Sequence, residues 1–397
     1  MMAPHRILFP AGGIWAIVAV GPVALDTGFD PTRSPLGGLT KWHAHEMLFG
    51  FAAAMFAGYA LTAMTSWPGK ARLSPEGVAT LVALWALARL SAAGVLGPEP
   101  GLAAPAAVAF MGFLTLILAR SALRSRALRA APLALFSLAM TGYQIAVVIG
   151  AGPIHLPVLA FAALLSVVGG RMVAAFTANS LTCSERQTRR VQAAGIFGLF
   201  GSVTILTALG LETLRAAPGW LGACLLLAAA FETTRALLLL SREILTDGLL
   251  LMLHAGYFWL PIGLALVALG KTQGAPLPEG AALHGIAAGA VACTIYAVAA
   301  RAVAWRRDRL RASPFDGGGF VLVWVAAAWR VFAPAESQWA AAASALWGLA
   351  WAIFLARHGA ALFHPAPRPV FSGPRRPDLG HPQDGQDRVA TTRSEAS

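Results

Sequence analysis

Long runs of apolar residues recur along almost the whole chain, and they constrain the fold more than any other feature. The runs are continuous rather than alternating and are rich in Ala and Leu, which is typical of membrane-spanning helices and not of barrel strands. Only 12% of the residues are charged, about half the share that is usual in soluble domains. We therefore expect an all-α, polytopic membrane helix bundle.

About twelve transmembrane helices can be drawn, and together they form one transmembrane domain, residues 1–363. The segment 364–397 is rich in Pro, Gly, Asp, Arg and Ser, so we expect a disordered cytoplasmic tail there. The first run lacks a clear small-residue cleavage site, and we interpret it as an uncleaved span. The expected spans are 7–25, 44–65, 76–97, 102–119, 132–151, 156–179, 193–211, 216–239, 247–269, 281–303, 318–333 and 339–357.

The positions of Lys and Arg predict the orientation of the chain. Most of the 30 lie near the termini or in one alternate set of connections, which includes the clusters 120–129, 186–190 and 301–311 and the pair Arg235 and Arg242. Cytoplasmic loops carry such an excess, so we expect both termini in the cytoplasm. The same rule accounts for the net charge of +12. We therefore expect the lipid bilayer, and no nucleic acid, as partner.

Four of the nine histidines lie at the predicted outer ends of three spans: His43, His45, His155 and His284. Imidazole binds copper, iron and zinc, and is the usual protein ligand of haem iron. Within residues 42–47 (WHAHEM), Glu46 adds a carboxylate that could orient an imidazole, and Met47 adds a thioether suited to copper. If this segment is helical, its two histidines point about 200° apart and serve different partners, whereas an extended segment would place both on one face. Water-exposed histidines at helix ends are the alternative.

Ionisable residues inside a span are costly and mark candidate functional sites. His254 lies about 10 Å into its span from the cytoplasmic side. Arg171 follows two glycines and needs an anion, either a carboxylate or a haem propionate. Glu232 and the two threonines after it provide either polar packing or a proton path. The three cysteines are far apart, and no Walker lysine, GxSxG or HExxH motif occurs.

Several stretches resemble the NnrS family, multi-span bacterial membrane proteins linked to nitric oxide and denitrification. The stretches follow the family's order over about residues 40–300. They are 42–51 (WHAHEMLFGF), 57–63 (AGYALTA), 155–158 (HLPV), 169–179 (GGRMVAAFTAN), 253–257 (LHAGY) and 284–290 (HGIAAGA). One departure is that residues 305–309 (WRRDR) stand where the family commonly has Gly-His-Thr-Gly-Arg, so any site that uses that histidine would be altered here.

The resemblance implies about twelve spans, haem as a cofactor, copper as a further one, and a role in the response to nitric oxide or nitrosative stress. Six residues match its motif positions and are candidates for cofactor binding: His43, His45, His155, Arg171, His254 and His284. Candidate metal ligands are the five histidines of that set with Glu46 and Met47.

The leading hypothesis is a haem-binding inner-membrane protein, with copper as a further cofactor, in which the four outer histidines form a ligand cluster. His254 and Arg171 would act as inner ligand and propionate partner, and nitric oxide would be a diatomic ligand. One alternative is a histidine-lined transporter or metal-handling permease. Another is a non-catalytic sensor or assembly factor. The sequence assigns neither a catalytic activity nor an electron donor.

Overall fold

The computed structural model describes residues 4–22, 36–68, 72–97, 100–180, 185–271, 277–303, 312–333 and 337–359. Within these ranges the regular structure is entirely helical, with no strand, as the apolar runs predict. The expected disordered tail, 364–397, and the divergent stretch 305–309 lie outside the described residues.

Ten helical segments of the described chain are long and apolar enough to cross a membrane. They coincide with ten of the predicted spans. The helices at the other two predicted spans are not among these ten. The helix His5–Val18 has only 14 residues, and Pro75–Ala92 carries both Glu76 and Arg89. The ten are Leu39–Met64, Ala104–Ser125, Ala131–Val148, His155–Asn179, Glu185–Thr213, Pro218–Leu239, Gly248–Gly270, Glu279–Ala302, Pro314–Phe332 and Gln338–His358.

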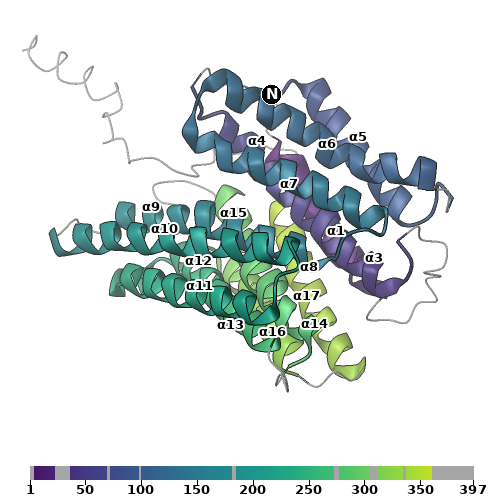
Figure 1. Cartoon of the computed structure of the whole chain (residues 1–397). Helices are drawn as coiled ribbons and strands as arrows, with labels where there is room; N and C mark the ends of the chain where they lie inside the picture. Colours follow the sequence, from purple (N-terminus) through teal and green to yellow (C-terminus); the bar gives the residue numbers. More distant parts are fainter. Residues whose placement is uncertain are drawn as a thin grey trace, which may run out of the picture.

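Figure 1 shows the arrangement of the helices, whose labels are used from here on. Two groups are visible, one formed by α1 and α3 to α7 and the other by the helices from α9 onward. The first group comprises α1 (His5–Val18), α3 (Leu39–His45), η2 (Glu46–Ala52), α4 (Ala53–Met64), α5 (Pro75–Ala92), α6 (Pro100–Ser125), η3 (Leu128–Ala130) and α7 (Ala131–Val148). The later elements are α8 (His155–Leu164), η4 (Leu165–Gly169), α9 (Gly170–Ser180), α10 (Glu185–Thr213), α11 (Pro218–Leu239), η5 (Arg242–Thr246), α12 (Gly248–Tyr257), α13 (Trp259–Gly270), α14 (Glu279–His284), η6 (Gly285–Ala292), α15 (Cys293–Val303), α16 (Pro314–Phe332) and α17 (Ser337–His358).

Contacts between the first and last helices join the two groups. α1 packs on α17, and α8 packs on both α7 and η6. The indole of Trp347 donates a hydrogen bond over 2.9 Å to the carbonyl of Ala16, while Phe51 meets Trp347 and Trp351 edge-on. Aromatic edge contacts of this kind add specific attraction to the burial of apolar surface, so the junction forms part of the apolar core.

Ser–Pro pairs begin two of the helices. The Ser74 hydroxyl accepts the backbone N–H of Gly77 at the start of α5. Ser313 and Asp316 form a reciprocal capping box at the start of α16. Such caps satisfy backbone donors that have no partner inside the helix, and proline suits the first helical position because it has no N–H to lose.

Within the described residues, three spans contain a π-helical segment, namely η2, η4 and η6. A π turn closes each hydrogen-bonded ring over one extra residue, so the side chains beyond it are rotated relative to an uninterrupted α-helix. All three segments lie in the spans at whose predicted outer ends the sequence places histidines. Because π segments are frequent at functional sites, these three spans are the strongest candidates for contributing residues to a functional site.

Close backbone packing fixes the position of η6. A Cβ atom added at Gly263 of α13 would lie 2.7 Å from the carbonyl carbon of Gly285, closer than a real side chain allows. Small residues permit such approach between membrane helices. The segment after His284 is therefore held directly against α13.

Candidate functional site

His45, at the junction of α3 and η2, belongs to a buried ionic network. Its Nδ1 lies 2.8 Å from Glu46 Oε1, and Arg89 Nη1 donates over 2.8 Å to Glu46 Oε2. The amide nitrogen of Gln144 lies 3.2 Å from His45 Nε2 and also donates to the carbonyl of Ala107. The Glu46 carboxylate orients the imidazole as the sequence suggests, but both ring nitrogens of His45 are engaged within the protein.

His155 lies in a separate ion cluster. Its Nε2 is 2.6 Å from Glu212 Oε1, and Lys271 Nζ lies 3.5 Å from the same oxygen and 3.0 Å from Glu279 Oε1. Burial lowers the pKa of Lys271, but hydrogen bonds and charges from Glu279 and Glu212 outweigh this, so the pKa is raised above its usual value. This cluster ties α8 and α10 to α14 and to Lys271 at the end of α13.

His43 and His284 are alike in how their rings are held. His43 Nδ1 lies 2.9 Å from the carbonyl oxygen of Ala19, and His284 Nδ1 lies 2.5 Å from that of Gly280. Because a carbonyl only accepts, each Nδ1 must carry the proton and each Nε2 has a lone pair. The described residues provide no hydrogen-bond partner for either Nε2. An imidazole fixed in this way is arranged as a metal ligand.

The two histidines lie within electrostatic range. His43 and Arg330, in the last turn of α16, both act electrostatically on His284, and Arg330 acts on His43 as well. Two of the four histidines predicted at the outer ends of the spans therefore lie in the same region of the bundle as a cation.

The single cluster of four histidines that the sequence suggests does not form. Among the described residues, no group of three or more His, Cys, Asp or Glu side chains is placed to hold a metal ion. Glu46 is paired with Arg89. Met47 packs against an apolar cluster that includes Trp42 and Leu36. The segment Leu39–His45 is helical, so its two histidines serve different partners.

The expected inner pair is not brought together either. His254 is buried, and its Nε2 lies 2.8 Å from the hydroxyl of Thr177. That hydroxyl donates to the carbonyl of Val173, so the imidazole is the donor. Arg171 lies six residues before Thr177 on the same helix, about 240° around its axis, and its Nε donates to the carbonyl of Val167 over 2.7 Å.

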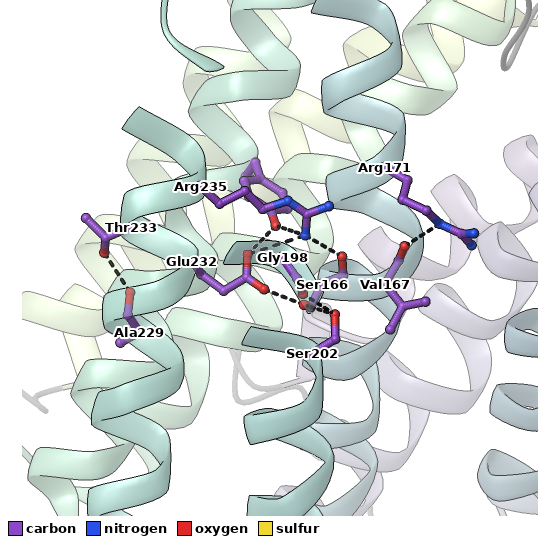
Figure 2. A network of polar contacts seen from close by, with 10 residues as sticks. Ser166, Val167, Arg171, Gly198, Ser202, Ala229, Glu232, Thr233 and Arg235 are labelled. Carbon is purple, nitrogen blue, oxygen red and sulfur yellow. Dashed lines mark hydrogen bonds and ion pairs between the residues drawn. The ribbon is translucent and has the colours of Figure 1, made fainter. Parts of the chain in front are cut away.

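Glu232 is the centre of a second buried network, which Figure 2 shows. Its carboxylate accepts hydrogen bonds from the hydroxyls of Ser166 and Tyr257, the latter over 2.5 Å. Arg235 Nη1 lies 3.6 Å from Glu232 Oε2 and donates to the Ser166 carbonyl over 2.7 Å and to Tyr257 over 3.1 Å. Arg171 points away from this network (Figure 2).

The sequence-based assignment of Arg235 to a cytoplasmic connection is wrong. Arg235 lies inside α11 and is 3% exposed. Glycines make room for it, since a Cβ at Gly170 would lie 2.2 Å from Arg235 Cζ and one at Gly198 would lie 2.4 Å from it. The sequence feature that indicates this ion pair is the spacing of Glu232 and Arg235, because residues i and i+3 share a helix face.

This network supports the polar-packing interpretation of Glu232. Ser166 belongs to the π segment η4, and Arg235 satisfies its carbonyl. Charges buried together must be paired and hydrogen-bonded to be tolerated. The ion pair therefore holds η4 against α11 and α12.

The fold and these networks define the class of protein: a polytopic helical membrane protein with buried ion networks beside π segments in its spans. A model of the NnrS family, described as NnrS protein, matches residues 1–366. The chain belongs to the NnrS family, and the resemblance of its motifs is confirmed. No curated protein matches the chain.

Proposed function

We propose that the chain is a haem-binding protein of the bacterial inner membrane that acts in the response to nitric oxide or nitrosative stress. In this proposal it has twelve spans and both termini in the cytoplasm. The observation that carries the proposal is that His43 and His284, on different helices, have their rings held in the same way and lie within electrostatic range. Each Nδ1 is held by a backbone carbonyl, and Arg330 lies near both rings.

The number and charge of these groups favour haem over a bare metal ion. Imidazole is the usual protein ligand of haem iron, and a guanidinium suits a propionate, so His43, His284 and Arg330 would be the residues that hold the group. A copper ion would find only these two ligands among the described His, Cys, Asp and Glu side chains. The positive charge of Arg330 would also oppose it. Copper therefore ranks second in the proposal.

The chain's own residues have separate tasks in this arrangement. The carbonyls of Ala19 and Gly280 fix the tautomer and the orientation of the two rings. His43 and His284 would present Nε2 as ligand atoms, and Arg330 would hold the acidic groups of the cofactor. When bound, the haem would supply one-electron redox chemistry or a coordination position for a diatomic ligand such as nitric oxide.

An absorption spectrum of protein purified from haem-replete cells, combined with metal analysis, tests the proposal. We expect a Soret band that shifts when nitric oxide is added to the reduced protein. His43→Ala and His284→Ala should lose or shift the band, whereas His155→Ala, which removes a histidine paired with Glu212, should keep it. Colourless protein, or a Soret band unchanged in both variants, would refute the assignment. Metal binding without haem would support the permease alternative.

A further inference from the structure

A cavity of about 70 Å³ lies between the helices that carry two of the π segments. Its walls come from α1, α4, α8, η4, α9, η6 and α15 and are almost entirely apolar. Phe9, Phe56, Phe161 and Val168 are among the lining side chains, and the hydroxyl-bearing ones are Tyr59 and Thr294. A space of this composition does not favour charged or strongly polar molecules.

The hydroxyl of Thr294 is an exception among the threonines of the spans. Threonine hydroxyls in membrane helices usually donate to the carbonyl four residues earlier, and several in this chain do so, among them Thr62, Thr141 and Thr177. For Thr294 that carbonyl belongs to Ala290, inside η6. The neighbouring Cys293 bonds to the carbonyl of Ala288, five residues earlier, over 3.7 Å.

The shifted π register therefore leaves the Thr294 hydroxyl without a hydrogen-bond partner among the described residues, although Thr294 is 3% exposed. A buried donor without an acceptor is unfavourable. Since this side chain lines the cavity, an acceptor atom of a bound molecule would satisfy it.

The size of the cavity restricts the occupant further. An apolar cavity of about 150 Å³ holds benzene or xenon, so a space of about 70 Å³ is too small for an aromatic ring. It is large enough for a molecule of two or three heavy atoms. Water is a poor occupant, because a buried water needs two to four polar partners.

The position of the cavity suits a molecule that arrives through the lipid. Tyr59, Leu164, Val168 and Ile295 line it and are only partly buried, so it is reachable from the side of the bundle. Uncharged gases dissolve readily in the apolar interior of a bilayer. Val291 of the lining lies about two helical turns beyond His284 in the same span.

We propose that this cavity binds a small uncharged gas of two or three heavy atoms, with the Thr294 hydroxyl donating a hydrogen bond to it. The affinity for such a gas follows from the volume, the apolar walls and the unpaired hydroxyl. The identification of the natural occupant as nitric oxide rests on the proposed function, because the cavity shares a span with His284.

Crystals of the full chain pressurised with xenon test the cavity directly. We expect an anomalous xenon peak there in the wild type and in Val167→Phe, and none in Val168→Phe, because a phenyl ring at position 168 fills the space. Val167 is the matched control, since it is in the same π segment, is also partly buried and does not line the cavity. No xenon in the wild-type cavity, or a lipid acyl chain that xenon does not displace, would overturn the proposal.

Nitrous oxide, which accepts a hydrogen bond where xenon does not, tests the hydroxyl. Thr294→Val keeps the shape of the side chain, so xenon occupancy should be unchanged. Nitrous oxide affinity should fall roughly twofold or more. Unchanged nitrous oxide binding, or equal losses of both gases, would overturn the role of Thr294. Neither probe needs haem, so these results are independent of whether the protein binds haem.

Discussion

Replacing Arg235 by Met tests the ion pair that holds η4, because it removes the charge and keeps most of the side chain's length. Arg235 and Glu232 are 3% and 0% exposed, respectively. The substitution deprives Glu232 of its cation and the Ser166 carbonyl of its donor. Removing one partner of a buried pair costs about 3–5 kcal/mol. Replacing both partners by apolar residues is often close to neutral, so Glu232→Met with Arg235→Met should be less destabilised than Arg235→Met alone.

The free energy of unfolding can be measured by titrating the purified protein with SDS in mixed micelles and following helicity. The matched control is Arg171→Met, since the Arg171 side chain is exposed and bonds to a carbonyl of its own span. That control should change stability by no more than about 0.5 kcal/mol. The reasoning is refuted if Arg235→Met costs no more than the control, or if the double variant loses the sum of the two single effects.

Three further predictions follow from other contacts. Gly198→Ala should cost about 1–3 kcal/mol, because the added Cβ would overpack against Arg235, and most of that loss should disappear in an Arg235→Ala background when both are measured by SDS titration. Arg89→Met leaves the Glu46 carboxylate buried without its cation and should cost about 3–5 kcal/mol in the same assay; a loss below 1 kcal/mol would contradict this. The pKa of Lys271 is raised above its usual 10.5, so its ion pairs stabilise the fold below that pH and are lost as pH rises through the folded-state pKa. The melting temperature of Lys271→Met should therefore fall less between pH 9 and 12 than that of the wild type.

The spans could be predicted because their signal is local. About 20 consecutive apolar residues suffice to identify a membrane helix, and ten predicted spans coincide with helices of that kind in the described chain. The two exceptions are informative. His5–Val18 is short, and Pro75–Ala92 contains Arg89, which is held by Glu46 from another helix. The hydropathy of one segment does not reveal such a partner.

The candidate site was only partly predictable. Charge bias placed His43 and His284 at the same predicted side, and in the structure they lie within electrostatic range. The spacing of His43 and His45 correctly indicated different partners. The identity of those partners depends on contacts far apart in the chain, such as Gln144 with His45, and a single sequence contains no trace of them.

The π segments could not be predicted either, because their residues are ordinary helix formers. The stretch Gly285–Ala292 reads GIAAGAVA, which has no proline and no polar interruption. What sets its register is the surroundings, including the close approach of Gly263 to Gly285. A prediction of which side chains face the same neighbour therefore fails beyond such a segment if it assumes a constant period of 3.6 residues.

Because each π turn contains an extra residue, the number of residues in a π segment determines the direction in which the side chains after it point. Deleting one residue from Gly285–Ala292 would restore the α register and turn everything downstream by about 100°. Thr294 would then bond to its own helix and turn away from the cavity. Among relatives of this chain, the number of residues between the equivalents of His284 and Thr294 would thus distinguish proteins that retain a gas-binding chamber from those that have lost it, even where every lining residue is unchanged.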